Sequence, residues 1–298
     1  MKKNFKYLAL LFVVIVGIIF ACNKKKEQKE TILEGSISIL VDESLTPIME
    51  DQVAVFENSY NAKVKLVSQS ENEALVSLSK GISGVIILPR KLTAKEETMF
   101  SSKKITPRTT PFARDAVALI SNKKSIDTLI SIDEIVSFLK GSKNKIKGLV
   151  FDNPNSSSVQ YMLRLASIKE LPKDDVFSFK TNEEVIKYVA SNDGMIGVVG
   201  INWIVQPSST MVESVEQVNV LSVKPMGASK FFSPSQENIA TGDYPLARDL
   251  YIINCQGYEG LGMGLASFIT GEIGQRIILK SGLAPVRVPS RKIRITNN

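Results

Sequence analysis

The sequence predicts an α/β protein with a parallel, wound sheet, and three observations support this prediction. Short apolar runs alternate with segments of helical spacing, an order that places helices between parallel strands. The composition, with 44% hydrophobic and 22% charged residues, is that of a globular protein. The 298 residues are enough for two ordinary domains. We therefore expect a mixed α/β chain with a sizeable core in two parts.

The first residues indicate a secretory signal peptide over residues 1–21. Three lysines precede an apolar run over residues 8–20, which is shorter than the ~20 residues that a membrane-spanning helix needs. Residues 19–22 (Ile-Phe-Ala-Cys) resemble a bacterial lipobox, in which Cys22 is acylated. An uncleaved anchor and a non-lipidated signal are the alternatives. We expect a lipidated tether over residues 22–32.

The elements of the first part follow in order. Residues 36–41 alternate and then run apolar as a buried strand, and a polar turn with Ser44 leads to Pro47, which suits the first turn of a helix over 48–59. Strand patterns over 62–67 and 84–88 enclose a helical pattern over 71–80.

The middle of the chain repeats this plan. Residues 105–112 carry two prolines, and a strong buried strand over 116–120 follows, where we expect the chain to cross between domains. A helix over 132–139 has Ser131 as its expected N-cap. Further on, we expect a strand over 218–223 that carries the chain back toward the first domain, and a helix over 265–279.

The stretch over residues 151–159 (Phe-Asp-Asn-Pro-Asn-Ser-Ser-Ser-Val) is the candidate binding element. A buried strand ends at Phe151, and Ser156, Ser157 and Ser158 stand at the start of a helix. Hydroxyls and free backbone N–H groups at a helix start form a cradle for negative charge. Taken alone, however, serines at a helix start are more often simple caps.

Charge and residue counts exclude several functions. Much of the formal charge of +7 lies in the tether and the C-terminal tail, without interleaved aromatic residues, so we expect no nucleic-acid partner. The chain has no histidine, which removes Ser-His-Asp and Cys-His catalysis and the usual zinc sites. With Cys22 acylated, Cys255 has no disulfide partner and is expected to be a buried thiol. We expect no enzyme activity, no cofactor and no metal.

Four segments in the same order resemble the phosphate-binding proteins of bacterial ABC phosphate importers. Residues 89–97 (Pro-Arg-Lys-Leu-Thr-Ala-Lys-Glu-Glu) and 111–118 (Pro-Phe-Ala-Arg-Asp-Ala-Val-Ala) are similar to two family segments. Residues 238–248 (Asn-Ile-Ala-Thr-Gly-Asp-Tyr-Pro-Leu-Ala-Arg) are the most specific match. Residues 274–275 (Gly-Gln), together with 281–286 (Ser-Gly-Leu-Ala-Pro-Val), are similar to the family's C-terminal helix and exit.

This resemblance implies the type II periplasmic-binding-protein architecture, with a ligand cleft between two lobes. The first lobe would comprise residues 33–112 and 224–298, and the second lobe residues 113–223. The resemblance further implies a monomeric lipoprotein, anchored at the periplasmic face of the cell envelope, that captures inorganic phosphate for the membrane subunits of an ABC importer.

The resemblance also implies ligand-binding residues. Asn155, Ser156, Ser157 and Ser158 match the family's phosphate loop, Ser44 falls at the loop of the first lobe, and Ser70 lies near its second contact. The loop lacks the Arg that usually precedes it, and Gly84 stands where many members have an Asp that accepts a proton from phosphate. Arg90 is the candidate compensating cation, with a surface salt bridge as its alternative.

Three other functions stay open. The same fold could serve a receptor for another oxyanion, such as sulfate or molybdate, because the expected proton acceptor is missing. It could also serve a sensor or scaffold lipoprotein that binds no small anion. A phosphatase-like hydrolase is the least compatible with the absence of histidine.

Overall fold

A computed structural model describes residues 30–142 and 145–290 of the chain. Its centre is a ten-stranded sheet with the order β2-β1-β3-β11-β4-β8-β6-β7, to which β12 and β9 add through β4. The strands are β1 (Gly35–Asp42), β2 (Ala62–Gln69), β3 (Val85–Leu88), β4 (Arg108–Asn122), β6 (Gly148–Phe151), β7 (Val176–Ser178), β8 (Met195–Gly200), β9 (Val218–Val220), β11 (Ala247–Asn254) and β12 (Ala284–Pro285). A separate two-stranded sheet joins β5 (Leu129–Ser131) and β10 (Ser222–Lys224).

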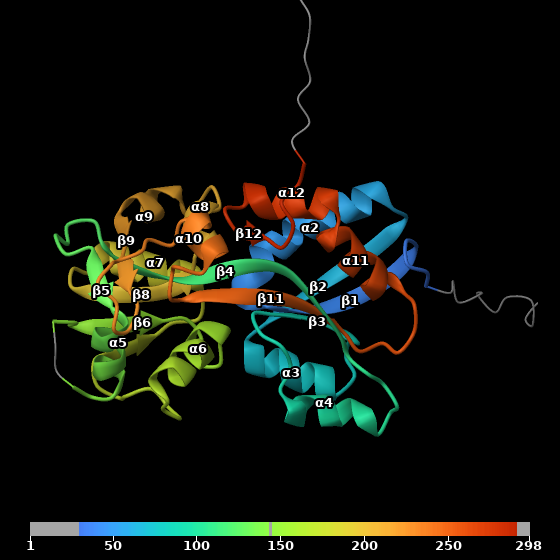
Figure 1. Ribbon diagram of the computed structural model, residues 1–298, viewed down its shortest axis with the longest axis horizontal. Helices are drawn as coiled ribbons and strands as arrows, with labels where there is room; N and C mark the ends of the chain where they lie inside the picture. Colours follow the sequence, from blue (N-terminus) through green and yellow to red (C-terminus); the bar gives the residue numbers. More distant parts are fainter. Residues whose placement is uncertain (1–29, 143–144, 291–298) are drawn as a thin grey trace, which may run out of the picture. The chain divides into compact units, whose positions relative to one another are not determined.

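Strand β4 belongs to two groups of strands. Its residues up to Ala116 pair with β11, whereas Val117 and the residues after it pair with β8 and β9 (Figure 1). We call the strands β1, β2, β3, β11 and the first part of β4, with their helices, the first lobe. We call the remainder of β4, β6, β7, β8 and β9, with their helices, the second lobe. The lobe limits that the sequence suggested, 33–112, 113–223 and 224–298, stay a prediction.

The sheet is mixed, which corrects the expectation of a purely parallel one. Pairs β1–β2, β1–β3, β6–β7 and β6–β8 are parallel, but β11 runs antiparallel to β3 and β4, and β4 runs antiparallel to β8. Alternation of helices and strands predicts parallel pairs only within each lobe. The connections that pass between the lobes supply the antiparallel strands.

Helices cover the strands on both faces. In the first lobe, α3 and α4 lie on one face, and α2, α11 and α12 lie on the other (Figure 1). The helices are η1 (Glu43–Leu45), α2 (Thr46–Ser59), α3 (Glu71–Ser79), α4 (Ala94–Ser101), α5 (Ile132–Leu139), α6 (Ser157–Ala166), α7 (Asn182–Ser191), α8 (Asn202–Val205), α9 (Val212–Glu216), α10 (Gln236–Thr241), α11 (Leu261–Thr270) and α12 (Glu272–Lys280).

The core follows the two-residue period of the strands. In β1, Ile39 and Val41 pack on one face, in the cluster that includes Phe56, while Leu40 packs on the other face with Leu78. Because successive side chains of a strand point to opposite faces, a strand with helices on both faces is apolar at nearly every position. This explains why Ile39, Leu40 and Val41 form a continuous apolar run before Asp42.

Local signals placed most helix starts correctly. Pro47 stands in the first turn of α2, and Ser131 caps α5 by accepting a hydrogen bond from the Glu134 N–H. The single helix predicted over 265–279 is wrong, because α11 ends at Thr270 and α12 starts at Glu272. Gly271 between them has an extended backbone, with φ −78° and ψ 174°. Apolar periodicity continues through this break and therefore did not reveal it.

Strand β4, which both lobes share, contains a β-bulge in its pairing with β11. Between β11 and β4, Leu250 pairs with Ala113 and Tyr251 with Pro111, so Phe112 is skipped. The carbonyl of Phe112 accepts a hydrogen bond of 2.9 Å from Gln275 Nε2 on α12. The bulge therefore fastens the C-terminal helix to the strand that both lobes share.

The predicted strand over 218–223 is also divided, into β9 and β10. Strand β9 pairs with the second-lobe part of β4, and β10 pairs with β5. This stretch therefore does not yet return the chain to the first lobe. Residues 1–21 and Cys22, predicted as signal peptide and lipidation site, lie outside the described residues. No helix within 30–142 and 145–290 has the length and apolarity to cross a membrane.

Candidate functional site

The three serines predicted as a cradle start helix α6, as the sequence indicated. Ser156 is the N-cap and accepts a hydrogen bond from the Val159 N–H at 3.3 Å. Ser157 and Ser158 are the first two helical residues, and all three side chains are fully buried. Backbone N–H groups in the first turn have no acceptor within the helix, so the N–H groups of Ser157 and Ser158 are available to an acceptor that lies ahead of α6.

The end of strand β1 provides the opposing part of the site. Asp42 is the last residue of β1, and Ser44 follows in the short helix η1. The backbone N–H of Ser44 donates to Asp42 Oδ1 at 3.0 Å, and the Ser44 hydroxyl donates to the same oxygen. Both side chains are fully buried. The turn after the first strand therefore presents a hydroxyl and a carboxylate as one unit.

The two lobes meet at these residues. Ser157 of α6 donates its hydroxyl to Asp42 Oδ1 at 2.9 Å, and the hydroxyl oxygens of Ser44 and Ser157 lie 3.2 Å apart. Asn202 of α8 donates from Nδ2 to the Ser44 carbonyl at 3.0 Å. The structure thus brings Ser44 and the serine cradle together, as the family resemblance implied for a cleft between lobes.

A buried ion pair lies directly behind Ser157. Arg248 on β11 faces Asp115 on β4 in the antiparallel register, and its Nε and Nη2 bind the two carboxylate oxygens at 3.0 and 2.6 Å. The remaining nitrogen, Nη1, donates to Ser157 Oγ at 3.2 Å. Each of the two ion-pair side chains is only 1% exposed. This guanidinium orients the Ser157 hydroxyl toward Asp42 and places a permanent positive charge beside the cradle.

A second buried carboxylate supports the other side of the cradle. Asp152 follows strand β6 and accepts hydrogen bonds from the Ser156 hydroxyl and, at 3.0 Å, from Asn182 Nδ2. Asn182 in turn accepts from the Gly200 N–H at 3.1 Å. The strand end, the cap of α6 and the start of α7 are therefore held by one polar network.

The carboxyl groups of this region are pushed toward their protonated forms. Burial raises the pKa of Asp42 to about 6, against the hydrogen bond from Ser44 and the attraction of Arg248. Burial, with repulsion from Asp42, raises the pKa of Asp152 to about 7. Burial and then repulsion from Asp152 and Asp42 raise the pKa of Glu43 to about 8. These carboxyl groups therefore take up protons at a higher pH than exposed carboxyl groups do.

Several polar atoms of the site have no partner among the described residues. The hydroxyl of Ser158, Asp42 Oδ2 and Glu43 Oε1 are enclosed and make no hydrogen bond there. Buried polar groups are nearly always hydrogen-bonded, so each such atom needs an explanation. Here a free donor at the helix start and free acceptors at the end of β1 occur at the same junction of the two lobes.

The other predicted ligand-binding residues lie around this centre. Ser70, the N-cap of α3, is buried and donates its hydroxyl to Glu73 at 2.6 Å. Asn155 is exposed, and its carbonyl accepts from the Asn72 N–H at 3.4 Å across the two lobes. Arg90 binds Glu71 at 2.8 Å and Glu96 at 2.8 Å. The guanidinium of Arg90 is thus engaged within the first lobe, and the buried cation beside the serines is Arg248.

Sequence reasoning did not assign Asp42, Asp152 or Arg248 to the site. A usable signal existed, because Asp42 and Asp152 each follow directly on a buried strand, where the carboxyl ends of parallel strands gather ligand-binding groups. Arg248 ends the most specific of the resembling segments, and Asp115 lies in another. A buried arginine requires a buried partner, and the apolar residues that follow Arg248 in β11 indicate that this strand is buried.

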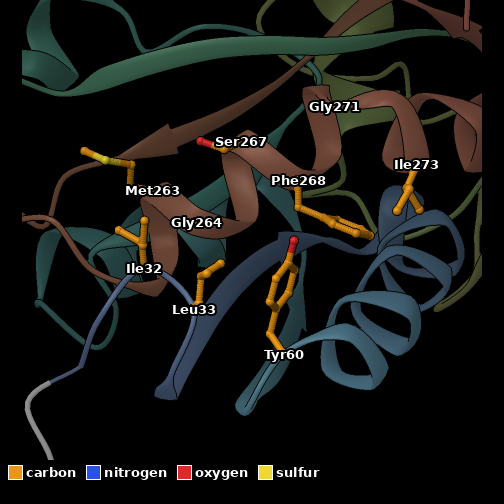
Figure 2. Close-up of a pocket in the computed structure, with 9 residues that line it drawn as sticks. All are labelled: Ile32, Leu33, Tyr60, Met263, Gly264, Ser267, Phe268, Gly271 and Ile273. Atoms are coloured by element: carbon orange, nitrogen blue, oxygen red, sulfur yellow. The ribbon is translucent and has the colours of Figure 1, made fainter.

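No cluster of three or more acidic or cysteine side chains within residues 30–142 and 145–290 is arranged to hold a metal ion. A separate hollow of about 280 Å³ lies at the other end of the first lobe (Figure 2). Its walls are mostly apolar, with Ile32 and Leu33 before β1, Tyr60 after α2, and Met263 and Phe268 on α11. This hollow has no charged lining residue and does not suit an oxyanion.

Comparisons with known proteins agree with this architecture. The phosphate-binding protein PstS of Pseudomonas aeruginosa is 24% identical over 287 residues, which covers 87% of this chain and 85% of that protein. A structure described as a phosphate ABC transporter substrate-binding protein from Clostridium perfringens, with bound phosphate, superposes with a TM-score of 0.69 at 18% identity. It covers 85% of this chain and 100% of that one.

An ABC-type phosphate transport receptor from Vibrio cholerae gives a TM-score of 0.63 at 18% identity, covering 83% of this chain and 99% of the receptor. At these identities the structural likeness establishes a shared fold, the two-lobed α/β architecture with the lobes joined through β4. The model of the PBP superfamily domain (PBP_like_2) matches residues 26–272, and the chain belongs to this periplasmic-binding-protein family.

Proposed function

We propose that this protein is an extracytoplasmic receptor that captures inorganic phosphate and delivers it to an ABC importer. The observation that supports it best is the meeting of free donors and free acceptors at the lobe junction. Ser158 and the first turn of α6 supply donors, and Asp42 supplies an acceptor. The relatives named above, which carry phosphate-binding names, support the same choice.

The donors favour an anion with several oxygens. The N-terminus of α6 carries partial positive charge from the helix dipole, and Arg248 adds a full charge that reaches Ser157 at 3.2 Å. A tetrahedral oxyanion can accept from two backbone N–H groups and a hydroxyl at once, which is the usual anion site at a helix start.

The acceptors favour an anion that carries a proton. Burial raises the pKa of Asp42 to about 6, so this carboxyl is still mostly ionised at pH 7 and would repel a fully ionised oxyanion. Phosphate keeps a proton at neutral pH and can donate it to Asp42, whereas sulfate cannot. Asp42 therefore takes the place of the acceptor that the sequence lacks at Gly84, and discrimination follows from a site built to pair a ligand OH.

The role is capture without chemical conversion. Ligand contacts to Ser44 in the first lobe and to the α6 serines in the second lobe favour the closed arrangement of the lobes. The membrane subunits of the importer would receive the ligand from this closed form. We further propose that the protein acts as a monomer, anchored through a lipid on Cys22 at the periplasmic face of the cell envelope.

Titration calorimetry of the purified protein with phosphate, sulfate and molybdate tests this function. We expect saturable one-to-one binding of phosphate and at least tenfold weaker binding of sulfate at pH 7, a factor that corresponds to about 1.4 kcal/mol. A preference for sulfate or molybdate would assign another oxyanion to the same cleft. Absence of heat with all three would favour a sensor or scaffold role.

A further inference from the structure

One carboxylate oxygen joins the two lobes directly. Asp42 Oδ1 accepts three hydrogen bonds, two from Ser44 of its own lobe and one from Ser157 of the other. An N–H group and two hydroxyls are the kind of donors that a helix-start site offers to a bound oxyanion. Asp42 Oδ1 therefore occupies, within the protein, the position of a ligand oxygen.

The surroundings strengthen this contact. Asp42 is fully buried, and hydrogen bonds to an ionised acceptor are stronger than neutral ones, especially where water is excluded. Arg248 donates to Ser157 Oγ, which leaves the hydroxyl hydrogen of Ser157 directed at Asp42. By the usual strength of such bonds, each shifts an equilibrium roughly 10- to 100-fold.

The bonds at this junction are made by protein atoms on both sides. Asn202 adds a second one by donating to the Ser44 carbonyl, so the turn after β1 is held from α6 and from α8. These hydrogen bonds between protein residues join the two lobes without a ligand oxygen between them. A free oxyanion that uses Ser44 and Ser157 has to replace Asp42 at these donors.

We propose that Asp42 is a built-in substitute for the ligand, which holds the lobes closed before ligand arrives and must give up Ser44 and Ser157 to an incoming oxyanion. The first half of this proposal concerns the protein alone. The second half rests on the proposed function.

Two readouts follow the closure of the lobes. Small-angle X-ray scattering gives the radius of gyration of the whole protein. The chain has a single tryptophan, Trp203, which lies in α8 next to Asn202 and is partly buried. Its emission reports on the separation of the lobes. Both are measured on protein dialysed until a phosphorus assay finds no phosphate.

Three variants test separately the charge of Asp42, the shape of its side chain and the hydroxyl of Ser157. Asp42→Ala removes the substitute oxygen, Asp42→Asn keeps its shape without the charge, and Ser157→Ala removes only the bond from the second lobe. Asp51→Asn is the matched control, because Asp51 of α2 also bridges the lobes, accepting from Gln206 at 3.2 Å, but through a solvent-exposed hydrogen bond. Circular dichroism establishes that each variant is folded.

We expect phosphate-free wild type and Asp51→Asn to be compact, with phosphate adding little further compaction. Asp42→Ala and Ser157→Ala should be more expanded without phosphate and show red-shifted Trp203 emission, with Asp42→Asn intermediate. Equal radii of gyration and equal emission spectra for phosphate-free wild type and Ser157→Ala would overturn the proposal. This comparison holds even if Asp42→Ala does not fold. If these variants expand but neither they nor the wild type bind phosphate, the role of Asp42 in closure is supported and the proposed phosphate function is refuted.

Discussion

Asp42 Oδ1 and Ser157 Oγ lie 2.9 Å apart, although 115 positions separate the two residues in the sequence. One stands at the end of β1 and the other at the start of α6, so this contact exists only when both lobes are correctly placed. The same carboxylate keeps its second oxygen, Oδ2, without a partner among the described residues. Asp42 is therefore the residue at which closure and ligand selection can be tested together.

Replacing Asp42 is expected to reduce the discrimination between phosphate and sulfate. In Asp42→Ala the acceptor for the ligand's proton is gone, and with it the repulsion of a fully ionised oxyanion. We expect the ratio of the two dissociation constants, measured by calorimetry at pH 7, to fall toward one. Asp51→Asn should keep the wild-type ratio. A ratio that Asp42→Ala leaves unchanged would place the discriminating group elsewhere.

Replacing Ser158 should weaken phosphate binding without lowering the stability of the protein. Its hydroxyl is buried without a partner, so Ser158→Ala removes no hydrogen bond of the protein and should leave the free energy of unfolding unchanged or higher. A hydrogen bond to a charged ligand contributes about 1.5–3 kcal/mol, and phosphate should bind more weakly by about tenfold or more in calorimetry.

The matched control for Ser158 is Ser235, the N-cap of α10, which accepts from the Asn238 N–H at 3.2 Å. Ser235→Ala should lower the stability by about 1 kcal/mol and leave phosphate binding unchanged. If Ser158→Ala behaves like Ser235→Ala in both measurements, the Ser158 hydroxyl has only a structural role.

Two neighbouring ion pairs between β4 and β11 should differ in their contribution to stability. Arg248 and Asp115 are each 1% exposed, whereas Arg114 and Asp249, one register position away, are 36% and 48% exposed. Arg248→Met leaves a buried carboxylate without its partner and is expected to cost about 3–5 kcal/mol in urea unfolding. Arg114→Met should cost about 0–1 kcal/mol. Similar losses in the two variants would contradict the burial of the first pair.

The site should make the protein less stable as pH rises. Asp42 and Asp152 have pKa values raised to about 6 and 7 in the folded protein, so the folded state binds more protons than the unfolded state from about pH 4 to 7. The free energy of unfolding falls with pH wherever this holds, at roughly 1.4 kcal/mol per unit of pKa shift for each group.

This decline is measured by urea unfolding between pH 4.5 and 8 without phosphate. Carboxyl groups with lowered pKa values, such as Glu96 at about 2, lose their contribution only at more acidic pH and do not oppose the trend. The double variant Asp42→Asn, Asp152→Asn should show a flatter profile. A wild-type stability that increases over this range would contradict the raised pKa values.

Gly264 permits the closest backbone approach around the apolar hollow. A Cβ atom at this position would lie 1.6 Å from the Ile32 carbonyl oxygen, so Gly264→Ala must displace either α11 or the segment before β1. We expect a loss of about 1–3 kcal/mol in stability and faster hydrogen exchange at residues 31–35. Ser267→Ala, on the same helix and the same hollow, is the control and should change neither.

The sequence predicted local elements well and their assembly less well. Apolar runs marked β1 and β6 because buried strands need no polar face, and Ser156 marked the start of α6 because a helix needs an N-cap. The antiparallel pairing of β11 could not be predicted from these signals, since pairing depends on contacts between distant segments. The break at Gly271 was missed for a different reason, because the apolar spacing continues from α11 into α12.

The site shows a similar division. The family resemblance placed Ser44 and Ser157 among the expected ligand-binding residues, whereas the pattern of strand ends and helix starts alone favoured simple caps. The carboxylate of Asp42 was passed over, since an acid next to an anion site opposes simple charge matching. Only the spatial arrangement reveals that burial favours its protonated form and that Ser157 is its hydrogen-bond donor.

The sharing of β4 also limits how this fold can be recombined. Ala116 pairs with β11 and Val117 with β8, so the border between the two groups of strands falls between adjacent residues inside one strand. A second lobe transplanted from a homologue would have to be joined at that peptide bond, with the bulge at Phe112 and its link to Gln275 left intact. Exchange of lobes between relatives, in evolution or in the laboratory, is thereby confined to in-register strand fusions rather than loop exchanges.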